Sequence, residues 1–394
     1  MRPIAPLPAV AIFFLLFVLL AAACGGDGGG NPFGVESELV TPANRADAMA
    51  FAPDGRLFYA EHWTGNIRVV TADGELLPDP FATIIDIAPS HAIGLTGLAL
   101  DPQFGTNRYV YALYSQLISP GPPLVTRPAV IRFTEANNRG TNRTVILADL
   151  PEADPEHPFS VNGSIHFGPD GFLYLSLGDY DLRLETGSQG LELSQDLGTP
   201  IGSMLRINKE DGSIPTDNPF VGEEDVDSRI FAYGFRSSFN FTFHPQTGRL
   251  YGSDSTGVTC EELNIIEAGA NYGWPEGFEW PYTDCLASKR TQAIHLFARP
   301  GMQPEHFDSA VAIAGLEFVS GDVYPLLGDS LLVCESRTQI MRRLAFGDTD
   351  FDQVTEDDIV VEDCLLDITT SPDGIVYYSN FTEIRRLLPV DSGE

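Results

Sequence analysis

One short sequence motif recurs along this chain and constrains its fold more than any other feature. Each copy has an apolar residue, a turn of the Pro-Asp-Gly type and then an alternating apolar segment, as in FAPDGRLF. Proline presets φ, aspartate bonds its own backbone and glycine accepts positive φ, so each copy predicts two strands joined by a tight turn. Four clear copies and then two looser ones stand at Phe51–Phe58, Phe167–Tyr174, Phe243–Tyr251, Ser371–Tyr378, Leu98–Tyr111 and Leu316–Val333.

Repetition over most of the chain predicts an all-β fold, a six-bladed β-propeller with one blade for each copy. A length of 394 residues does not contradict a single domain, because closed all-β folds often exceed the usual domain size. The first blade is expected from Glu36 to Val70. Ile384–Leu388 can close the ring as a last strand, although the shared blade cannot be read from the sequence.

The N-terminus has the pattern of an export signal. Residues 1–23 combine Arg2, an apolar segment too short to span a membrane comfortably, and three alanines, which is typical of a signal peptide of the lipoprotein type. Cys24 would then be the lipidated first residue, with simple cleavage before it as the alternative. Residues 24–35 are expected to be a Gly-rich tether and residues 36–390 the propeller. The protein is therefore predicted to be exported to the cell envelope, on its periplasmic or extracellular face, and held to the membrane through a lipid anchor only.

The formal net charge is −32, with 55 acidic against 23 basic residues. Such a field repels a phosphate backbone, so nucleic acid is not expected as a partner. Clustered carboxylates on an acidic surface can instead attract calcium.

Four cysteines remain after Cys24, an even number that favours two disulfides in an oxidising compartment. Three pairings are possible, and the sequential one is preferred. It joins Cys260 to Cys285 and Cys334 to Cys364.

Four segments together resemble the glucose/sorbosone dehydrogenase family, soluble quinoproteins that oxidise sugars with pyrroloquinoline quinone (PQQ) and calcium. Their order and spacing cover most of the chain, and the family fold is a six-bladed propeller, in agreement with the repeat count. The segments carry the motifs GLTGLALDPQF, GSIHFGPDG, MLRIN and YGFR with NYGWP, and they lie at Gly94–Phe104, Gly163–Asp179, Met204–Phe220 and Tyr233–Pro275.

The resemblance implies a histidine base that takes the sugar hydroxyl proton, three residues before the glycine that corresponds to Gly163. That position is Ser160 here, and a serine cannot accept the proton without another base beside it. His157 lies close in sequence and could have taken the role. His166, in an alternating strand segment, is expected on a blade face.

The cofactor positions that the resemblance implies are partly changed. Arg236 is kept, but Ser237 stands where an asparagine is usual and Ala92 where a glutamine is usual. The basic residues expected late in the chain, around Ser336 and Cys364, are not matched, and Leu366 replaces an arginine that would serve the quinone carboxylates. PQQ is a tricarboxylate, so these losses leave its charges uncompensated.

The calcium positions are better preserved. The resemblance implies that backbone carbonyls of Gly257 and Val258 hold the cofactor calcium, and that Glu262 and the Tyr272 carbonyl hold a second calcium ion. Oxygen ligands of this kind suit calcium.

Two functions therefore remain open. One is oxidation of an aldose-type sugar with PQQ and calcium. The other is a catalytically inactive propeller that binds a glycan, a small molecule or an envelope protein. Aromatic residues in loop-like segments could stack on a sugar ring or anchor such a partner, or instead pack between blades. These residues are Trp63, Phe278, Trp280 and Tyr282.

Overall fold

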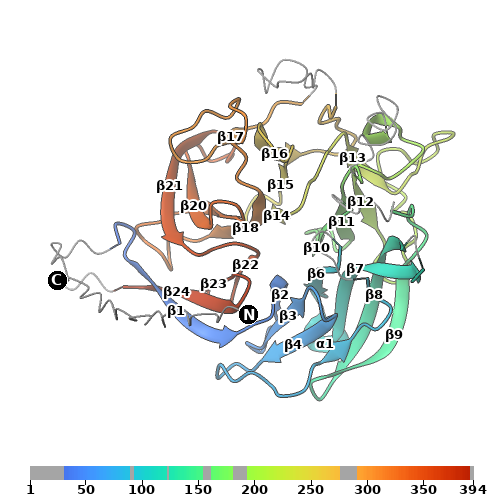
Figure 1. Cartoon of the computed structure of the whole chain (residues 1–394), viewed down its shortest axis with the longest axis horizontal. Helices are drawn as coiled ribbons and strands as arrows, with labels where there is room; N and C mark the ends of the chain where they lie inside the picture. The colour runs from blue at the N-terminus through green and yellow to red at the C-terminus, as the bar shows by residue number, and fades with distance from the viewer. Residues whose placement is uncertain are drawn as a thin grey trace, which may run out of the picture. The chain divides into compact units, whose positions relative to one another are not determined.

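The computed structural model describes residues 31–88, 93–121, 124–153, 161–180, 193–275 and 291–390. Within them the chain forms six four-stranded antiparallel sheets, arranged in a ring as the blades of a propeller (Figure 1). The middle of such a ring is the central channel of the fold. Neighbouring innermost strands contact each other around the whole ring. The predicted all-β fold with six blades is therefore confirmed. One short helix, α1, lies at Phe104–Asn107, and none of the helices in the described ranges is long and apolar enough to cross a membrane.

The first three blades are formed by consecutive strands, innermost first. Blade 1 contains β2 (Ala46–Phe51), β3 (Leu57–Glu61), β4 (Asn66–Val70) and β5 (Ala82–Thr83). Blade 2 contains β6 (Leu95–Leu100), β7 (Tyr109–Ser119), β8 (Val125–Ala136) and β9 (Arg139–Leu147). Blade 3 contains β10 (Asn162–Phe167), β11 (Leu173–Leu177), β12 (Ser203–Ile207) and β13 (Ile230–Tyr233).

The last three blades complete the ring. Blade 4 contains β14 (Phe241–Phe243), β15 (Leu250–Asp254), β16 (Glu261–Ile266) and β17 (His295–Phe297). Blade 5 contains β18 (Ile313–Val319), β19 (Ser330–Glu335), β20 (Ile340–Phe346) and β21 (Val354–Glu362). Blade 6 contains β22 (Ile368–Thr370), β23 (Val376–Ser379), β24 (Glu383–Pro389) and β1 (Val35–Pro42).

The repeated sequence motif forms the turn between the innermost and the second strand of each blade. In blade 1, the Asp54 carboxylate accepts the backbone N–H of Arg56 at 3.3 Å, and Gly55 has a φ of +85°. The Gly55 N–H closes the turn on the Ala52 carbonyl at 2.9 Å. Glycine is needed because other residues are strained at this φ. Proline, aspartate and glycine therefore each have the role expected from the sequence.

The N-terminal strand β1 closes the ring. It pairs with β24 on the outer edge of blade 6, from Val35 opposite Pro389 to Pro42 opposite Glu383. The expectation that Glu36–Val70 makes the first blade is thus wrong for its first part, since only the segment from Ala46 onward belongs to blade 1. A strand from each end of the chain shares one sheet because this pairing removes the open seam of the ring.

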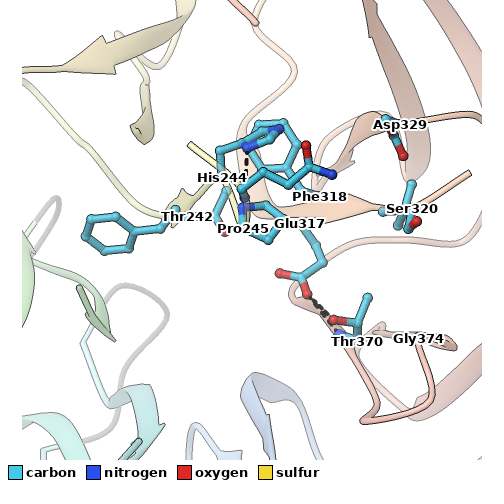
Figure 2. Close-up of a pocket in the computed structure, with 12 residues that line it drawn as sticks. Thr242, His244, Pro245, Glu317, Phe318, Ser320, Asp329, Thr370 and Gly374 are labelled. Atoms are coloured by element: carbon cyan, nitrogen blue, oxygen red, sulfur yellow. Dashed lines mark hydrogen bonds between the residues drawn. The ribbon is translucent and has the colours of Figure 1, made fainter. Parts of the chain in front are cut away.

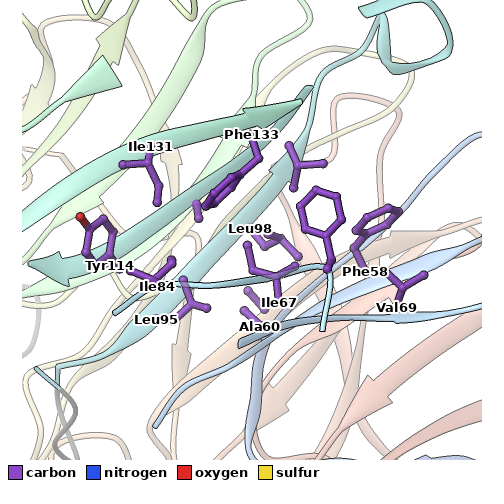
Figure 3. Close-up of a cluster of buried hydrophobic side chains, with 14 of the residues drawn as sticks. Phe58, Ala60, Ile67, Val69, Ile84, Leu95, Leu98, Tyr114, Ile131 and Phe133 are labelled. Carbon is purple, nitrogen blue, oxygen red and sulfur yellow. The ribbon is translucent and has the colours of Figure 1, made fainter. Parts of the chain in front are cut away.

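Apolar side chains fill the interfaces between blades. Between blades 1 and 2, Phe58 and Ile67 pack against Leu98 and Phe133 from the neighbouring sheet (Figure 3). Similar clusters occupy the other five interfaces. The sheets therefore stabilise each other face to face, and the innermost strands are left to line the channel.

Two disulfide predictions have different outcomes. Cys334 and Cys364 are joined, which confirms that pair. Cys260 is also disulfide-bonded. Its predicted partner, Cys285, lies outside the described residues, as does Cys24, so the Cys260–Cys285 pair and lipidation stay predictions.

Candidate functional site

The two ends of the channel differ in what they present. The innermost strands all start at one end, which we call the strand-start face, and finish at the other, the turn face, where the repeated turns lie. Arg236 and Ser237 lie on the strand-start face, just before β14. Both donate their backbone N–H groups to the buried Asp254 carboxylate, at 3.1 and 2.8 Å.

Arg236 lies against the backbone that follows β15. Its Nη1 donates to the Ser255 carbonyl at 3.0 Å. Gly257 has a φ of +82°, and a Cβ on it would lie 3.0 Å from Arg236 Nη1. The Val258 carbonyl accepts the Ala310 N–H at 3.3 Å. The structure thus brings together three of the residues assigned to the cofactor and its calcium, with the guanidinium directly beside the Gly257 backbone.

The late positions assigned to the quinone carboxylates do not fit an anionic cofactor. Cys364 is fully buried in the disulfide with Cys334, and Leu366 is buried two residues later. The disulfide joins the two regions where basic residues are expected. A buried disulfide and the apolar Leu366 side chain therefore occupy the place of the expected cations. A tricarboxylate at this position would lose the charge-assisted hydrogen bonds that stabilise it. We conclude that these residues do not fit PQQ.

Residues of β15 and β16 are better suited to calcium. Asp254 is directly opposite Glu262 in the antiparallel register, so the two buried carboxylates lie on one face of the sheet. Asn264 donates to Glu262 Oε2 at 3.3 Å. Tyr272 is buried, and its ring stacks on Phe235 with centroids 4.7 Å apart. Asp254 supplies the second carboxylate that sequence reasoning did not find. The described residues contain no cluster of three or more His, Cys, Asp or Glu arranged around a metal position.

His166 lies on β10 as a half-buried residue that bonds to its neighbours. Its Nε2 lies 3.0 Å from Ser164 Oγ and 3.1 Å from Asn240 Oδ1. Burial lowers the pKa of His166 to about 4, so the ring is neutral near pH 7. The remaining assigned positions of the base and cofactor, His157, Ser160 and Ala92, lie outside the described residues, and so do Phe278, Trp280 and Tyr282.

The strand-start face also carries a group that the sequence did not reveal. Asp47, at the start of β2, binds Arg45 Nε at 2.9 Å and lies 2.6 Å from His62 Nδ1, which directly follows β3. The Asp47 and His62 side chains are each 1% exposed. The contact between Asp47 and His62 holds together the two backbone segments that carry Arg45 and Trp63.

Two exposed aromatic rings flank Arg45. Its guanidinium lies 5.2 Å from the Trp63 ring centroid and 5.7 Å from that of Phe381. Trp63 is 40% exposed and Phe381 47% exposed. The Arg45 N–H also donates to the Phe381 carbonyl at 2.9 Å. We call Arg45, Trp63 and Phe381 the aromatic patch. Trp63 was named from the sequence but Arg45 and Phe381 were not, because Phe381 comes from blade 6 and the other two residues from blade 1.

Fold and sequence together define a propeller of the glucose/sorbosone dehydrogenase family. The family profile described as glucose/sorbosone dehydrogenase matches residues 43–387, so the chain belongs to that family.

Its relatives include both enzymes and a binding protein. Aldose sugar dehydrogenase YliI of Escherichia coli is 25% identical over 342 residues, covering 84% of this chain and 85% of that protein. Quinoprotein glucose dehydrogenase B of Acinetobacter calcoaceticus is 30% identical over 253 residues, covering 60% of this chain and 51% of that protein. Human Hedgehog-interacting protein is 27% identical over 219 residues, covering 50% of this chain and 30% of that protein.

A solved structure agrees with the fold. The crystal structure of a Thermus thermophilus oxidoreductase described as a glucose dehydrogenase superposes with a TM-score of 0.72 and 28% identity. The match covers 90% of this chain and 100% of that one.

Proposed function

We propose that this protein is an exported sugar-binding propeller that recognises a pyranose ring at the strand-start face and does not oxidise it through PQQ. The aromatic patch carries the proposal. Trp63 and Phe381 are exposed aromatic residues against which the C–H groups of a sugar can pack, and the Arg45 guanidinium lies over both rings. A glycan is the ligand to which this combination is best suited.

The absence of quinone chemistry is supported by the residues at its expected site. Ser160 replaces the base, and Leu366 with the Cys334–Cys364 disulfide replaces the cations. The first change removes the group that would accept the sugar proton, and the second removes the cations that would bind the cofactor. The family nevertheless contains a relative named for its interaction with another protein, so loss of oxidation is compatible with membership.

A glycan array followed by calorimetric titration of the best binder tests the proposal. We expect Trp63→Ala to weaken binding at least tenfold without changing the melting temperature. Ile214→Ala is the matched control, since Ile214 is 46% exposed and lies in the segment between β12 and β13, outside the patch. An empty array, or equal binding by the Trp63 and Ile214 variants, would reject the aromatic patch as the site.

Aldose oxidation with PQQ and calcium is the second candidate, favoured by the contact between Arg236 and Gly257. In that case Arg236 would bind a cofactor carboxylate, while Asp254, Glu262 and the Tyr272 carbonyl would hold calcium. PQQ supplies the hydride acceptor when bound. Saturable PQQ binding together with dye reduction by any aldose would establish this candidate and refute the first.

Location and partner are further parts of the proposal. The sequence before Gly25 supports export and lipidation of Cys24, which would hold the propeller at the cell envelope. Mass spectrometry of the mature N-terminus, beside a Cys24→Ala variant, distinguishes lipidation from simple secretion. An envelope protein that carries the recognised glycan is the expected partner, and crosslinking in intact cells followed by glycosidase treatment tests it.

A further inference from the structure

The turn face contains a cavity that lies at the opposite end of the channel from the aromatic patch. Its volume is about 220 Å³, and it opens where β14, β18 and β22 reach their last residues (Figure 2). Twelve residues from blades 4, 5 and 6 line it, among them Glu317, Phe318, His244 and Asp329. None of the twelve is lysine or arginine, so the charge of the lining is negative.

Glu317 is the less exposed of the two carboxylates that line this cavity, since Asp329 is open to solvent. The Thr370 N–H and the Thr370 hydroxyl both donate to Glu317 Oε1, at 3.0 and 2.6 Å. Figure 2 shows the other carboxylate oxygen pointing away from Thr370. Two hydrogen bonds to one oxygen fix the side chain in place and leave the second oxygen to face another group.

A second, buried carboxyl on blade 6 interacts electrostatically with Glu317. Asp367, just before β22, accepts the Met49 N–H at 2.7 Å and is 3.3 Å from Asn240 Nδ2, and Asn240 in turn contacts His166. Burial, together with repulsion from Glu317, raises the pKa of Asp367 to about 8. Burial raises the pKa of Glu317 to about 7. Among the described residues, no lysine, arginine or histidine forms a salt bridge with either carboxyl, and no cation contributes to either pKa.

The other walls combine aromatic rings, polar groups and the exposed Asp329 carboxylate. His244 Nδ1 accepts the backbone N–H groups of Gln246 and Thr247, at 3.2 and 3.1 Å, so the proton of the neutral ring is on Nε2. Burial lowers the pKa of His244, although Asp329 opposes this shift. Phe243 and Phe318 also line the cavity. Aromatic rings beside a carboxylate form a good environment for an organic cation.

We propose that the turn-face cavity binds a small organic cation with a primary ammonium group, which pairs with the Glu317 carboxylate. The ammonium group donates to the second carboxylate oxygen, while the carbon chain contacts Phe318 and His244, whose ring centroids lie 4.5 Å apart in the lining. Binding neutralises a charge that the channel otherwise holds without a cation. This site is independent of the sugar site at the other end of the channel.

Saturation-transfer NMR with n-butylammonium and its neutral analogue 1-butanol tests the proposal at constant ionic strength. We expect butylammonium to bind tighter than butanol at pH 8, and about tenfold weaker at pH 6, where Glu317 is mostly protonated. Butanol binding should be the same at both pH values. Absence of butylammonium binding, or equal affinity for both probes, overturns the proposal.

The Glu317→Gln variant tests the effect of the negative charge alone, because glutamine has nearly the same shape and keeps an oxygen that accepts the hydrogen bonds from Thr370. We expect at least a tenfold loss of butylammonium binding at pH 8 and no change for butanol. Glu36→Gln is the matched control, since Glu36 is exposed on β1. If Glu317→Gln binds butylammonium as tightly as the native protein, or loses both probes equally, Glu317 is not the cation's partner and the proposal fails.

Discussion

Replacing Glu317 by glutamine should stabilise the protein at alkaline pH. Burial raises the pKa of this carboxyl from an ordinary 4.5 to about 7 in the folded state. Between these values the unfolded chain releases a proton that the folded protein keeps. The free energy of unfolding therefore falls by about 1.4 kcal/mol for each pH unit, and the loss is complete above the folded pKa.

The full cost of ionising Glu317 is then about 3 kcal/mol at pH 8, and glutamine removes it because it carries no charge. At pH 4.5 the carboxyl is protonated in the folded state and about half protonated in the unfolded chain, so the substitution should change stability by less than about 1 kcal/mol. Removal of the Glu317 charge also relieves its repulsion of Asp367, which adds to the gain.

Urea denaturation without added oxidant or reductant, at pH 4.5 and at pH 8, measures the change in the free energy of unfolding at each pH. Glu36→Gln should leave the difference between the two pH values unchanged. If Glu317→Gln gained the same stability at both pH values, or lost stability at pH 8, the charge argument would be refuted. A stabilised variant that no longer binds butylammonium would show that the native carboxylate is retained at a cost in stability.

Three further variants, two with substitutions and one with a deletion, test other parts of the structure. The Cys334→Ser/Cys364→Ser variant should lose about 3–4 kcal/mol, because the disulfide closes a loop with a sequence separation of 30, and urea denaturation of the variant beside the native protein, both without reductant, checks this. Gly257→Ala should lose about 1–2 kcal/mol in the same assay, since alanine is strained at a φ of +82° and its Cβ would press on Arg236. Deletion of β1 (Val35–Pro42) should lower the melting temperature by more than either substitution, because β24 is left without its outer partner.

The fold was predictable because its repeat is local. The turn chemistry of Pro53, Asp54 and Gly55 is fixed by neighbours in sequence, and the same residues recur in other blades at the same position. Strand β1 was assigned to the wrong blade for the opposite reason. Its partner β24 lies about 350 residues away, and nothing in the alternation of Val35–Pro42 indicates which sheet it joins.

The sites were less predictable, since they combine residues from different blades. Arg236 and Gly257 were found because they belong to motifs that resemble those of the family. Asp254 was missed as a companion of Glu262, because the two become neighbours only through the β15–β16 register. Glu317 was missed altogether. It is one polar residue in an otherwise apolar strand, and only the arrangement of β18 beside β22 places it in a cavity.

The two changes that support the proposed absence of quinone chemistry lead to a last prediction. A base that removes the sugar proton is useful only if a bound quinone accepts the hydride. Ser160 would affect proton removal and Leu366 would affect quinone binding, which are two requirements of the same reaction. Ser160→His restores the base but leaves Leu366 and the Cys334–Cys364 disulfide in the place of the cations. We therefore expect this variant, supplied with PQQ and calcium, to reduce no dye with any aldose. Dye reduction by the Ser160→His variant would mean that the remaining residues around Arg236 still bind the quinone, and that loss of the base alone separates this chain from the enzymes of its family.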